Sequence, residues 1–314
     1  MPYANLTTIL VQQKETIDGT ELKINNTSSD SITFSLSISK YNTNTTSVYI
    51  DGTLYDEIRE TKDINITLTS GEHTILITGD QNFSFPSYII GSDNNKYLTS
   101  AKLKITYNEL KARNFFQCSN LTSVEMEDYI TSIKDYCFYQ CSSLTSINLP
   151  NNLTELGNSC FNGCSSLTSI VIPDSVTTIG SRLCQFCSSL TYLKLSNGLS
   201  QLAGHFIADC NNLTSITIPD SVTNITNYAF SEANGLTSIT IPVNVKSVGN
   251  YAFKDASNLQ SIKMKATTPP TAGTSIFQGC SKLTKIYVPA GTLSSYQTAT
   301  NWTAYADKME EYND

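Results

Sequence analysis

The sequence predicts a repeat solenoid with a parallel β-sheet, preceded by a small antiparallel β-sandwich. Two observations carry this prediction: a 23-residue period that continues almost to the C-terminus, and a two-residue alternation of apolar side chains between residues 18 and 92. Fixed periods of about 20 to 50 residues are the signature of solenoids and related repeat folds. Alternation of apolar and polar residues is typical of half-buried strands.

Composition excludes several other classes of protein. The 314 residues include 20 Lys and Arg against 27 Asp and Glu, a net charge of −7, whereas binding of nucleic acid requires a basic excess. No apolar run approaches the roughly 18 residues of a membrane span, and Met1 to Thr20 lacks the basic start and apolar stretch of a signal peptide. We therefore expect no nucleic-acid partner, no membrane insertion, and a soluble chain without an export signal.

The N-terminal part is expected to comprise an arm or short helix over residues 1–17 and an immunoglobulin-like β-sandwich over residues 18–94. Turn signals at Asp51-Gly52, Ser70-Gly71 and Gly79-Asp80 separate its predicted strands. The apolar residues that mark these strands are Leu22 and Ile24, Ile32 to Ile38, Val48 and Ile50, Ile64 to Leu68, and Ile75 and Ile77. The segments VYIDGTLYD and ITLTSGEHTILITGD resemble PEGA-type surface modules.

The repeat covers residues 95–289 in about eight units that share the pattern L-T-S-I-x-I-P. Leu98 fits one period before the first of these units, and the last leucine follows after one extra residue near Pro269 and Pro270. The repeat leucines are Leu121, Leu144, Leu167, Leu190, Leu213, Leu236, Leu259 and Leu283. The isoleucines and valines at fixed offsets from them are predicted core positions.

A single 23-residue unit cannot bury its apolar side, so successive units must stack about 4.8 Å apart and share one core. The two ends of the stack would expose strand edges, and we expect both to be covered. The N-terminal domain is expected to cover the first coil near residues 97–106, and residues 290–314 to form a C-terminal cap. That cap would use residues at helical spacing, namely Leu293, Tyr296, Trp302, Tyr305 and Met309.

Segments such as CSSLTSINLP from Cys141 and CNNLTSITIP from Cys210 resemble leucine-rich repeats of the BspA-like kind. The resemblance implies a right-handed leucine-rich-repeat solenoid. It also implies a cell-surface or secreted protein implicated in adhesion. The C-terminal run KIYVPAG…YQTATNW…YADKMEEY is similar to endings of such arrays in proteins of gut bacteria.

Six of the nine cysteines precede a repeat leucine by three residues, a slot that holds Ala233 and Ala256 in other units. A small buried position explains this ladder, and we expect reduced thiols because parallel Cβ atoms about 4.8 Å apart exceed the preferred separation of a disulfide. The alternative is a zinc site formed by two C-x3-C pairs, Cys137 with Cys141 and Cys160 with Cys164. Core packing is the favoured interpretation, so no metal and no cofactor are expected.

Catalysis is not expected either. Only His73 and His205 could exchange protons near neutral pH, and they fall in different predicted domains. The chain contains no nucleophile elbow, phosphate loop or H-E-x-x-H motif. The protein is therefore predicted not to be an enzyme.

The outward residues of the repeat strands form the first candidate binding face. They consist of hydroxyl residues and a variable position, and the best candidates are Tyr192, Lys194, Thr217, Thr240, Lys263, Lys285 and Tyr287. Repeated hydroxyls could equally serve only the sheet exterior. An alternative face is an aromatic row at another repeat slot, which consists of Tyr136, His205, Tyr228 and Tyr251.

These features lead to two hypotheses of function. The first is a non-catalytic adhesion protein at a bacterial surface that contacts host proteins or glycans. The alternative is a structural or receptor-binding component of a phage tail or injection particle, which would form a symmetric oligomer. The sequence does not determine the ligand or the oligomeric state.

Overall fold

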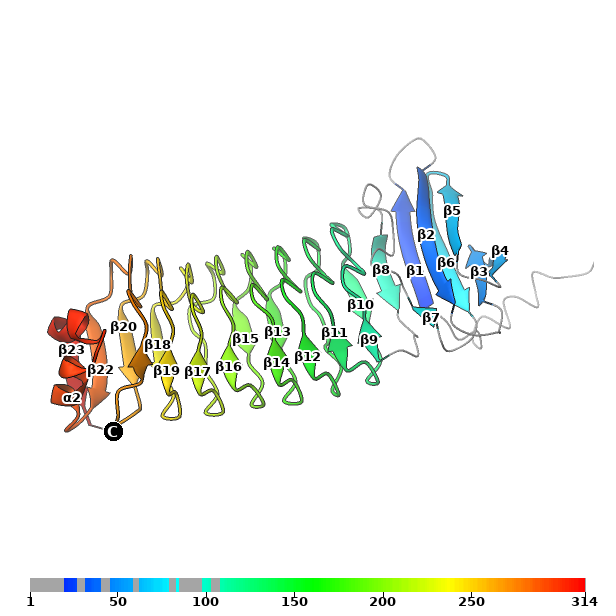
Figure 1. The fold of residues 1–314 in the computed structure, drawn as a ribbon. Coiled ribbons are helices and arrows are strands. Elements are labelled where there is room, and N and C mark those ends of the chain that lie inside the picture. The colour runs from blue at the N-terminus through cyan, green and yellow to red at the C-terminus, as the bar shows by residue number, and fades with distance from the viewer. Residues whose placement is uncertain are drawn as a thin grey trace, which may run out of the picture.

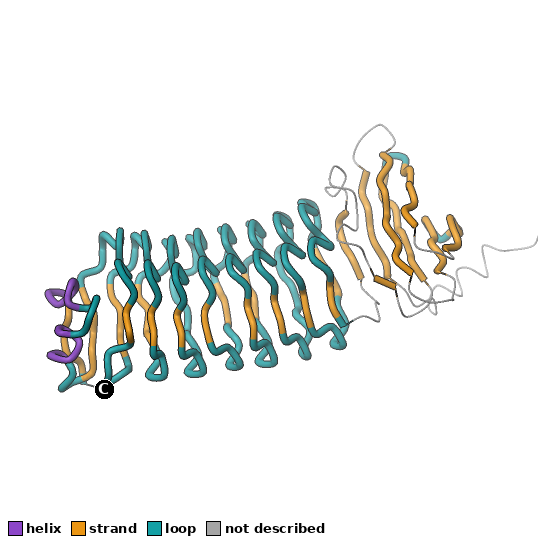
Figure 2. The backbone as a smooth tube through the Cα atoms, in the orientation of Figure 1, coloured by secondary structure: helices purple, strands orange, loops and turns teal. Residues whose placement is uncertain are grey.

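The computed structural model describes residues 20–26, 32–40, 46–58, 62–78, 83–84, 98–102 and 108–313. The predicted arm at residues 1–17 lies outside this part. Figure 1 shows a long stack of coils from β9 to α2, next to a group of longer strands from the N-terminal part of the chain. Most of each coil is loop and turn, with short strands at fixed places (Figure 2). The predicted repeat solenoid with a parallel β-sheet is confirmed.

The strands of the solenoid form two parallel ladders along its length. In both ladders the Cα partners of neighbouring coils are 23 residues apart, as in Ser169 with Tyr192 and Asn224 with Ser247. The extra residue near Pro269 and Pro270 makes the spacing 24 at one step of each ladder, Ser247 with Thr271 and Ser261 with Lys285. The first ladder, here called the strand face, comprises β8 (Leu98–Lys102), β10 (Ser123–Glu125), β13 (Ser169–Val171), β15 (Tyr192–Lys194), β18 (Ser238–Ile241), β20 (Ser261–Met264), β22 (Lys285–Pro289) and β23 (Met309–Tyr312). The second comprises β9 (Glu109–Leu110), β11 (Ser132–Ile133), β12 (Glu155–Leu156), β14 (Thr178–Ile179), β16 (Gln201–Leu202), β17 (Asn224–Ile225), β19 (Ser247–Val248) and β21 (Thr271–Ala272).

The repeat leucines form the centre of one continuous core. Those from Leu98 to Leu283 are at most 4% exposed, and the isoleucine or equivalent three residues later is also buried. On the side where each coil turns back, phenylalanine rings stack between coils, with centroids 5.1 Å apart for Phe115 and Phe138 and 5.5 Å apart for Phe138 and Phe161. Each unit therefore buries its apolar side against its two neighbours, as the repeat predicts.

The third side of each coil, here called the turn edge, contains two residues with left-handed backbone. In one coil these are Tyr136 (φ 59°) and Gln140 (φ 56°), and equivalent pairs recur along the stack. Backbone bonds join the turns of neighbouring coils, as from Phe138 N to Cys160 O (2.9 Å) and from Gln140 N to Asn162 O (2.7 Å). This bonding satisfies the polar backbone of a turn that would otherwise be partly buried without partners.

Both ladders are interrupted near the middle of the stack. The second ladder stops at β14 and restarts at β16, and the strand face stops at β15 and restarts at β18. The strand face is also interrupted earlier, between β10 and β13, where segment 144–150 contributes only the isolated bridge from Ser146 to Ser169. The segment 213–219 has the full L-T-S-I-T-I-P sequence but is not a strand, contrary to the sequence prediction. In the preceding coil the buried Ser196 replaces the usual proline, and its hydroxyl bonds to Val176 O and accepts from Gly198 N. The first of these bonds ties that coil to the one before it.

The N-terminal strands continue the solenoid sheet. Strand β1 (Thr20–Asn26) pairs antiparallel with β8, the strand of the first coil, and β8 pairs in parallel with β10. The same sheet continues through β6 (Gly71–Thr78), β3 (Thr46–Ile50) and β4 (Thr53–Ile58). A second sheet contains β5 (Lys62–Leu68), β2 (Ile32–Lys40) and β7 (Phe83–Ser84). The edge of the first coil is thus paired, which removes an exposed strand edge.

These two sheets contribute to one core. Ile24, Val48 and Ile75 from the first sheet and Ile66 and Leu68 from the second are at most 2% exposed. The immunoglobulin-like topology and the likeness to PEGA modules stay predictions, as does the boundary at residue 94, which lies outside the described residues.

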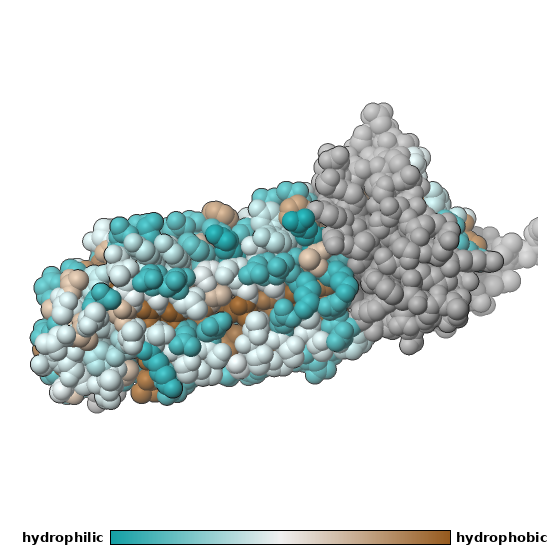
Figure 3. Space-filling view, in the orientation of Figure 1, coloured by the Kyte–Doolittle hydropathy of each residue, from teal (hydrophilic) through white to brown (hydrophobic). Residues whose placement is uncertain are grey.

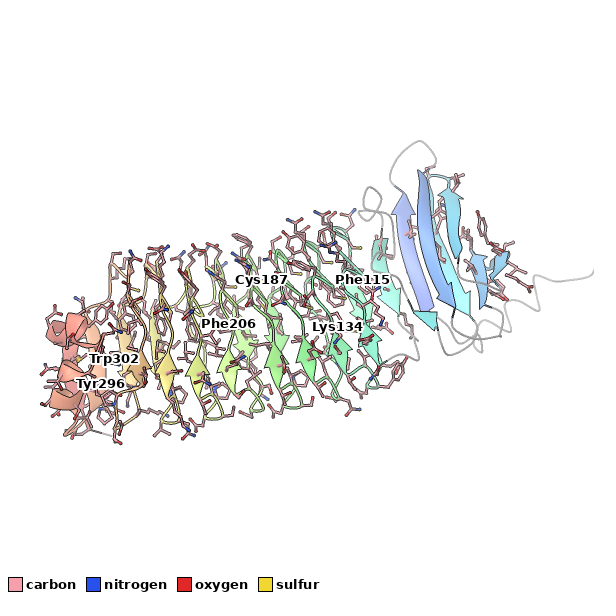
Figure 4. The ribbon with its side chains drawn as sticks, viewed as in Figure 1. Phe115, Lys134, Cys187, Phe206, Tyr296 and Trp302 are labelled. Carbon is pink, nitrogen blue, oxygen red and sulfur yellow. The ribbon has the colours of Figure 1, made fainter. Side chains whose placement is uncertain are left out.

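The C-terminal segment lies over the last coil (Figure 4). It contains α2 (Leu293–Thr298), the 3-10 helix η2 (Thr303–Lys308) and strand β23. Trp302 is 1% exposed, and its Nε1 donates to Pro270 O at 2.8 Å; the buried Tyr296 donates to Ala266 O at 2.7 Å. The expected helical spacing does not extend to Met309, which lies in β23 because that strand adds to the open edge of β22.

Candidate binding surface

The strand face presents one row of variable side chains. The row runs through Glu125, Val171, Lys194, Lys263 and Tyr287, and the paired register places Val171 beside Lys194 and Lys263 beside Tyr287. Tyr192 lies one row away and is 54% exposed, and Val171 is 48% exposed. Large apolar side chains with this exposure contribute contact area without supporting the core.

A groove lies on the strand face where the ladder is interrupted. Its volume is about 510 Å³, and it brings together three residues of the first candidate face, Thr217, Thr240 and Lys263. Asp220 and Lys265 also line it. The groove exists because segment 213–219 does not close onto the preceding strand, so the sequence motif alone could not reveal it.

The remaining candidates of this face lie beside the C-terminal strand. Lys285 bonds to Glu310 of β23, and the Lys263 ammonium lies 3.8 Å from the ring centroid of Tyr312. These contacts hold the two lysines near the surface of the sheet. The structure therefore joins Lys263, Lys285 and Tyr287 into one cluster, whereas Tyr192 and Lys194 lie on the other side of the interruption.

The alternative face divides into two parts. His205, Tyr228 and Tyr251 form a continuous stack with centroid separations of 5.2 Å at both steps. Tyr136 lies three coils before His205, and packs instead against Tyr139 at 5.8 Å. The expectation of one aromatic row is thus corrected, because the coils between Tyr136 and His205 carry Ser159 and Arg182 in that slot. All four residues are half-buried.

The two histidines occupy unrelated environments. Nδ1 of His73 lies 2.7 Å from Asp51 Oδ2 beside the β3–β4 turn, while His205 lies on the turn edge of the solenoid. Burial lowers the pKa of His205, and Arg182 adds to this effect. The two side chains do not form a common site: His73 contacts Asp51, His205 stacks on Tyr228, and neither lines the strand-face groove.

The cysteines are free and line the core of the turn edge. Cys141, Cys164 and Cys187 each donate a hydrogen bond to a backbone carbonyl of the preceding coil at 3.1 Å. Burial raises the pKa of Cys160 and Cys164 well above the ordinary value, which disfavours the thiolate that zinc requires. In the part of the chain that the structure describes, no group of three His, Cys, Asp or Glu residues is placed to hold a metal ion.

A second groove on the turn edge was not predicted from the sequence. It has a volume of about 550 Å³ and is lined by Gln117, Tyr139, Gln140, Asn162, Gly163 and Phe186, together with three serines. The one sequence feature that could have indicated this groove is Phe186 itself, because other coils have Gln, Gly, Asp or Glu at the equivalent position. Phe186 is 51% exposed.

The surface between these features is mostly polar. Figure 3 shows hydrophilic residues over much of the visible face of the solenoid, with a hydrophobic band along its length. Among the described residues, no helix has the length and apolar character needed to cross a bilayer.

Comparisons with known proteins agree with this architecture. The family model for the BspA type leucine rich repeat region matches residues 92–214 and 202–300, with six copies. A leucine-rich repeat protein from Bacteroides ovatus is similar, with 25% identity and a TM-score of 0.52, over 74% of this chain and 66% of that protein. This chain therefore spans slightly less than two thirds of that relative.

Two other solved structures show lower similarity. A leucine-rich repeat protein from Eubacterium ventriosum has 22% identity and a TM-score of 0.37, over 64% of this chain and 68% of that protein. A leucine rich cell surface protein from Faecalibacterium prausnitzii has 18% identity and a TM-score of 0.32, over 75% and 92%. A search of curated proteins found no match. Since the family model matches well over half of its length, the chain belongs to the family of proteins with BspA type leucine-rich repeats.

Proposed function

We propose that the chain is a non-catalytic binding protein, displayed at or secreted from a bacterial cell, that contacts a host protein through the strand face. The observation that carries the proposal is the groove in which Thr217, Thr240 and Lys263 lie together on an otherwise regular array. An extended array of this kind suits a large partner better than a small molecule. The surface location is the expectation that the family resemblance supports.

The charge of the groove favours a protein with an acidic patch. Lys263 and Lys265 line it, whereas elsewhere on the strand face Lys194 is paired with Asp174 and Lys285 with Glu310. Only Asp220 lines the groove with opposite charge. Complementary charge raises the association rate and selects among partners. Tyr192 and Tyr287 add the tyrosine side chains that are enriched at the centres of protein interfaces.

The test is a binding screen of the full chain against mucins, matrix proteins, bacterial envelopes and a glycan panel. Binding to a protein ligand should weaken about tenfold or more in the variant Tyr192→Ala/Lys194→Ala/Lys263→Ala. The matched control Tyr129→Ala/Lys246→Ala/Lys282→Ala changes the same residue types away from the candidate positions and should bind normally. Equal loss in both triple variants, or none in the first, would contradict a site on the strand face.

A further inference from the structure

We propose that the groove on the turn edge is a separate binding site for a short, neutral oligosaccharide. This turn-edge groove is lined by Gln117, Tyr139, Gln140, Asn162, Gly163 and Phe186. Its volume of about 550 Å³ falls within the range of ligand pockets, about 300–1,000 Å³. It does not share a lining residue with the strand-face groove, so the proposal goes beyond the function proposed above.

Phe186 is the residue that the fold does not explain. It is 51% exposed and has a left-handed backbone (φ 61°), a conformation that disfavours bulky side chains. Its backbone bonds, from Phe186 N to Ala208 O at 3.0 Å and from Ser188 N to Phe186 O at 2.9 Å, do not need the ring. Other coils place Gln117, Gln140 or Gly163 in the same slot. A strained, exposed aromatic residue at such a position points to a role in binding.

Gly163 creates the space beside that ring. It occupies the slot between Gln140 and Phe186 in the stack, with φ 77°, and a Cβ there would lie 2.9 Å from Gln140 Cγ. A side chain at this position would fill the gap between the two neighbouring coils. The glycine therefore leaves a hollow that has Phe186 on one side and Gln140 on the other.

The polar lining is neutral and consists of amides and hydroxyls. Gln117 Nε2 donates to Gln140 Oε1 at 2.9 Å, and Asn162 Nδ2 donates to Gln185 Oε1 at 3.2 Å. These bonds hold the amide planes of the lining residues Gln117, Gln140 and Asn162 in place. Each amide group has two N–H donors and a carbonyl acceptor, so each of these bonds uses only part of the capacity of a Gln or Asn side chain. Tyr139 is fixed by stacking on Phe116 at 5.0 Å.

This combination selects the chemistry of the ligand. Amide groups donate to and accept from sugar hydroxyls, while the C–H face of a sugar ring covers an aromatic ring such as that of Phe186. No Asp, Glu, Lys or Arg lines the groove, so charged ligands gain nothing from it. A purely apolar ligand would leave the amides without partners, which is costly. A neutral oligosaccharide satisfies both kinds of surface.

The experiment measures binding of the full chain to a panel of neutral oligosaccharides, which comprises cello-, malto-, xylo-, manno-, galacto- and chito-oligosaccharides. Isothermal titration then gives the affinity for each positive probe. Phe186→Gln installs the residue that two other coils carry in this slot, and Gly163→Gln fills the hollow. We expect at least one probe to bind the unmodified chain and to lose about tenfold or more in affinity with either variant.

The controls separate this site from the strand face and from misfolding. Tyr129→Ala and the strand-face variant Tyr192→Ala/Lys194→Ala should bind the positive probe normally. Phe186→Gln should keep or raise the melting temperature, because it replaces a strained bulky residue by one that the fold already accepts there. No binding of any probe to the unmodified chain, or unchanged binding by both groove variants, would overturn the proposal. Binding of a protein ligand that depends on Phe186 would overturn the assignment to carbohydrate.

Discussion

The thiol of Cys164 donates a hydrogen bond to the backbone carbonyl oxygen of Phe138 in the preceding coil, at 3.1 Å. The same carbonyl also accepts from Cys141 N at 3.2 Å, within its own turn. Equivalent thiol bonds recur at Cys141, Cys187 and Cys210. The cysteine ladder is therefore a series of small, buried donors that tie consecutive coils together.

Replacing one of these thiols should cost a modest amount of stability. Cys164→Ala removes a buried donor but leaves the Phe138 carbonyl its second partner, so the free energy of unfolding should fall by about 1–2 kcal/mol. Urea unfolding followed by circular dichroism measures the change. Cys164→Ser keeps a donor and should lose less. If Ser destabilises as much as Ala, the hydrogen bond does not contribute.

The buried thiols should also make stability depend on alkaline pH. Burial raises the pKa of Cys280 to about 12, and that of Cys160 well above its ordinary value of about 8.5. Their contribution is complete below about pH 8.5. It falls as pH rises toward the folded pKa, because the unfolded chain then releases thiol protons that the folded chain retains.

The expected slope can be measured under reducing conditions. Each such thiol lowers the free energy of unfolding by about 1.4 kcal/mol per pH unit in that window. The fall in stability from about pH 9 to about pH 10 should therefore be smaller in Cys164→Ala by roughly this amount. If the free energy of unfolding falls equally with pH in the unmodified chain and in Cys164→Ala, Cys164 is not a protonated thiol shielded from water.

Gly249 should not tolerate a side chain. A Cβ there would overlap the backbone nitrogen of Asn227 in the preceding coil. The close approach allows Asn250 N to donate to Asn227 Oδ1 at 2.7 Å. Gly249→Ala should therefore lower the free energy of unfolding by about 1–3 kcal/mol. Thr226→Ala, in the same slot one coil earlier, should change it by no more than about 0.5 kcal/mol. Equal effects in thermal unfolding would refute this packing argument.

Trp302 should be the main anchor of the C-terminal segment. Its ring packs on Tyr296 and Phe277 with centroid separations of 5.6 and 6.1 Å, and its Nε1 donates to Pro270 O. Trp302→Ala should destabilise the protein by about 3–5 kcal/mol. Trp302→Phe keeps part of the packing and should lose less. As the only tryptophan, Trp302 also reports its own environment, and its fluorescence should shift to longer wavelength on unfolding.

The sequence by itself determined the repeat, its phase and most of its core. Leu98 was placed in the series by spacing alone, and the structure pairs its strand with the next coil in that register. This succeeded because each unit has the same local pattern and can bury its leucine only against the equivalent leucine of its neighbours. The burial of the repeat cysteines was predictable for a similar reason, because other units have alanine at the same position.

Only the tertiary structure decided where the grooves lie. Segment 213–219 has the repeat sequence without strand geometry, and the coil before it has Ser196 where other coils have proline. The turn-edge groove arises from a glycine and a phenylalanine in adjacent coils, Gly163 and Phe186. Neither residue predicts a groove when its own repeat unit is considered alone. A repeat pattern records what the coils have in common. A binding site depends on how neighbouring coils differ. Such differences form a groove only when stacking brings residues 23 positions apart in the sequence into contact.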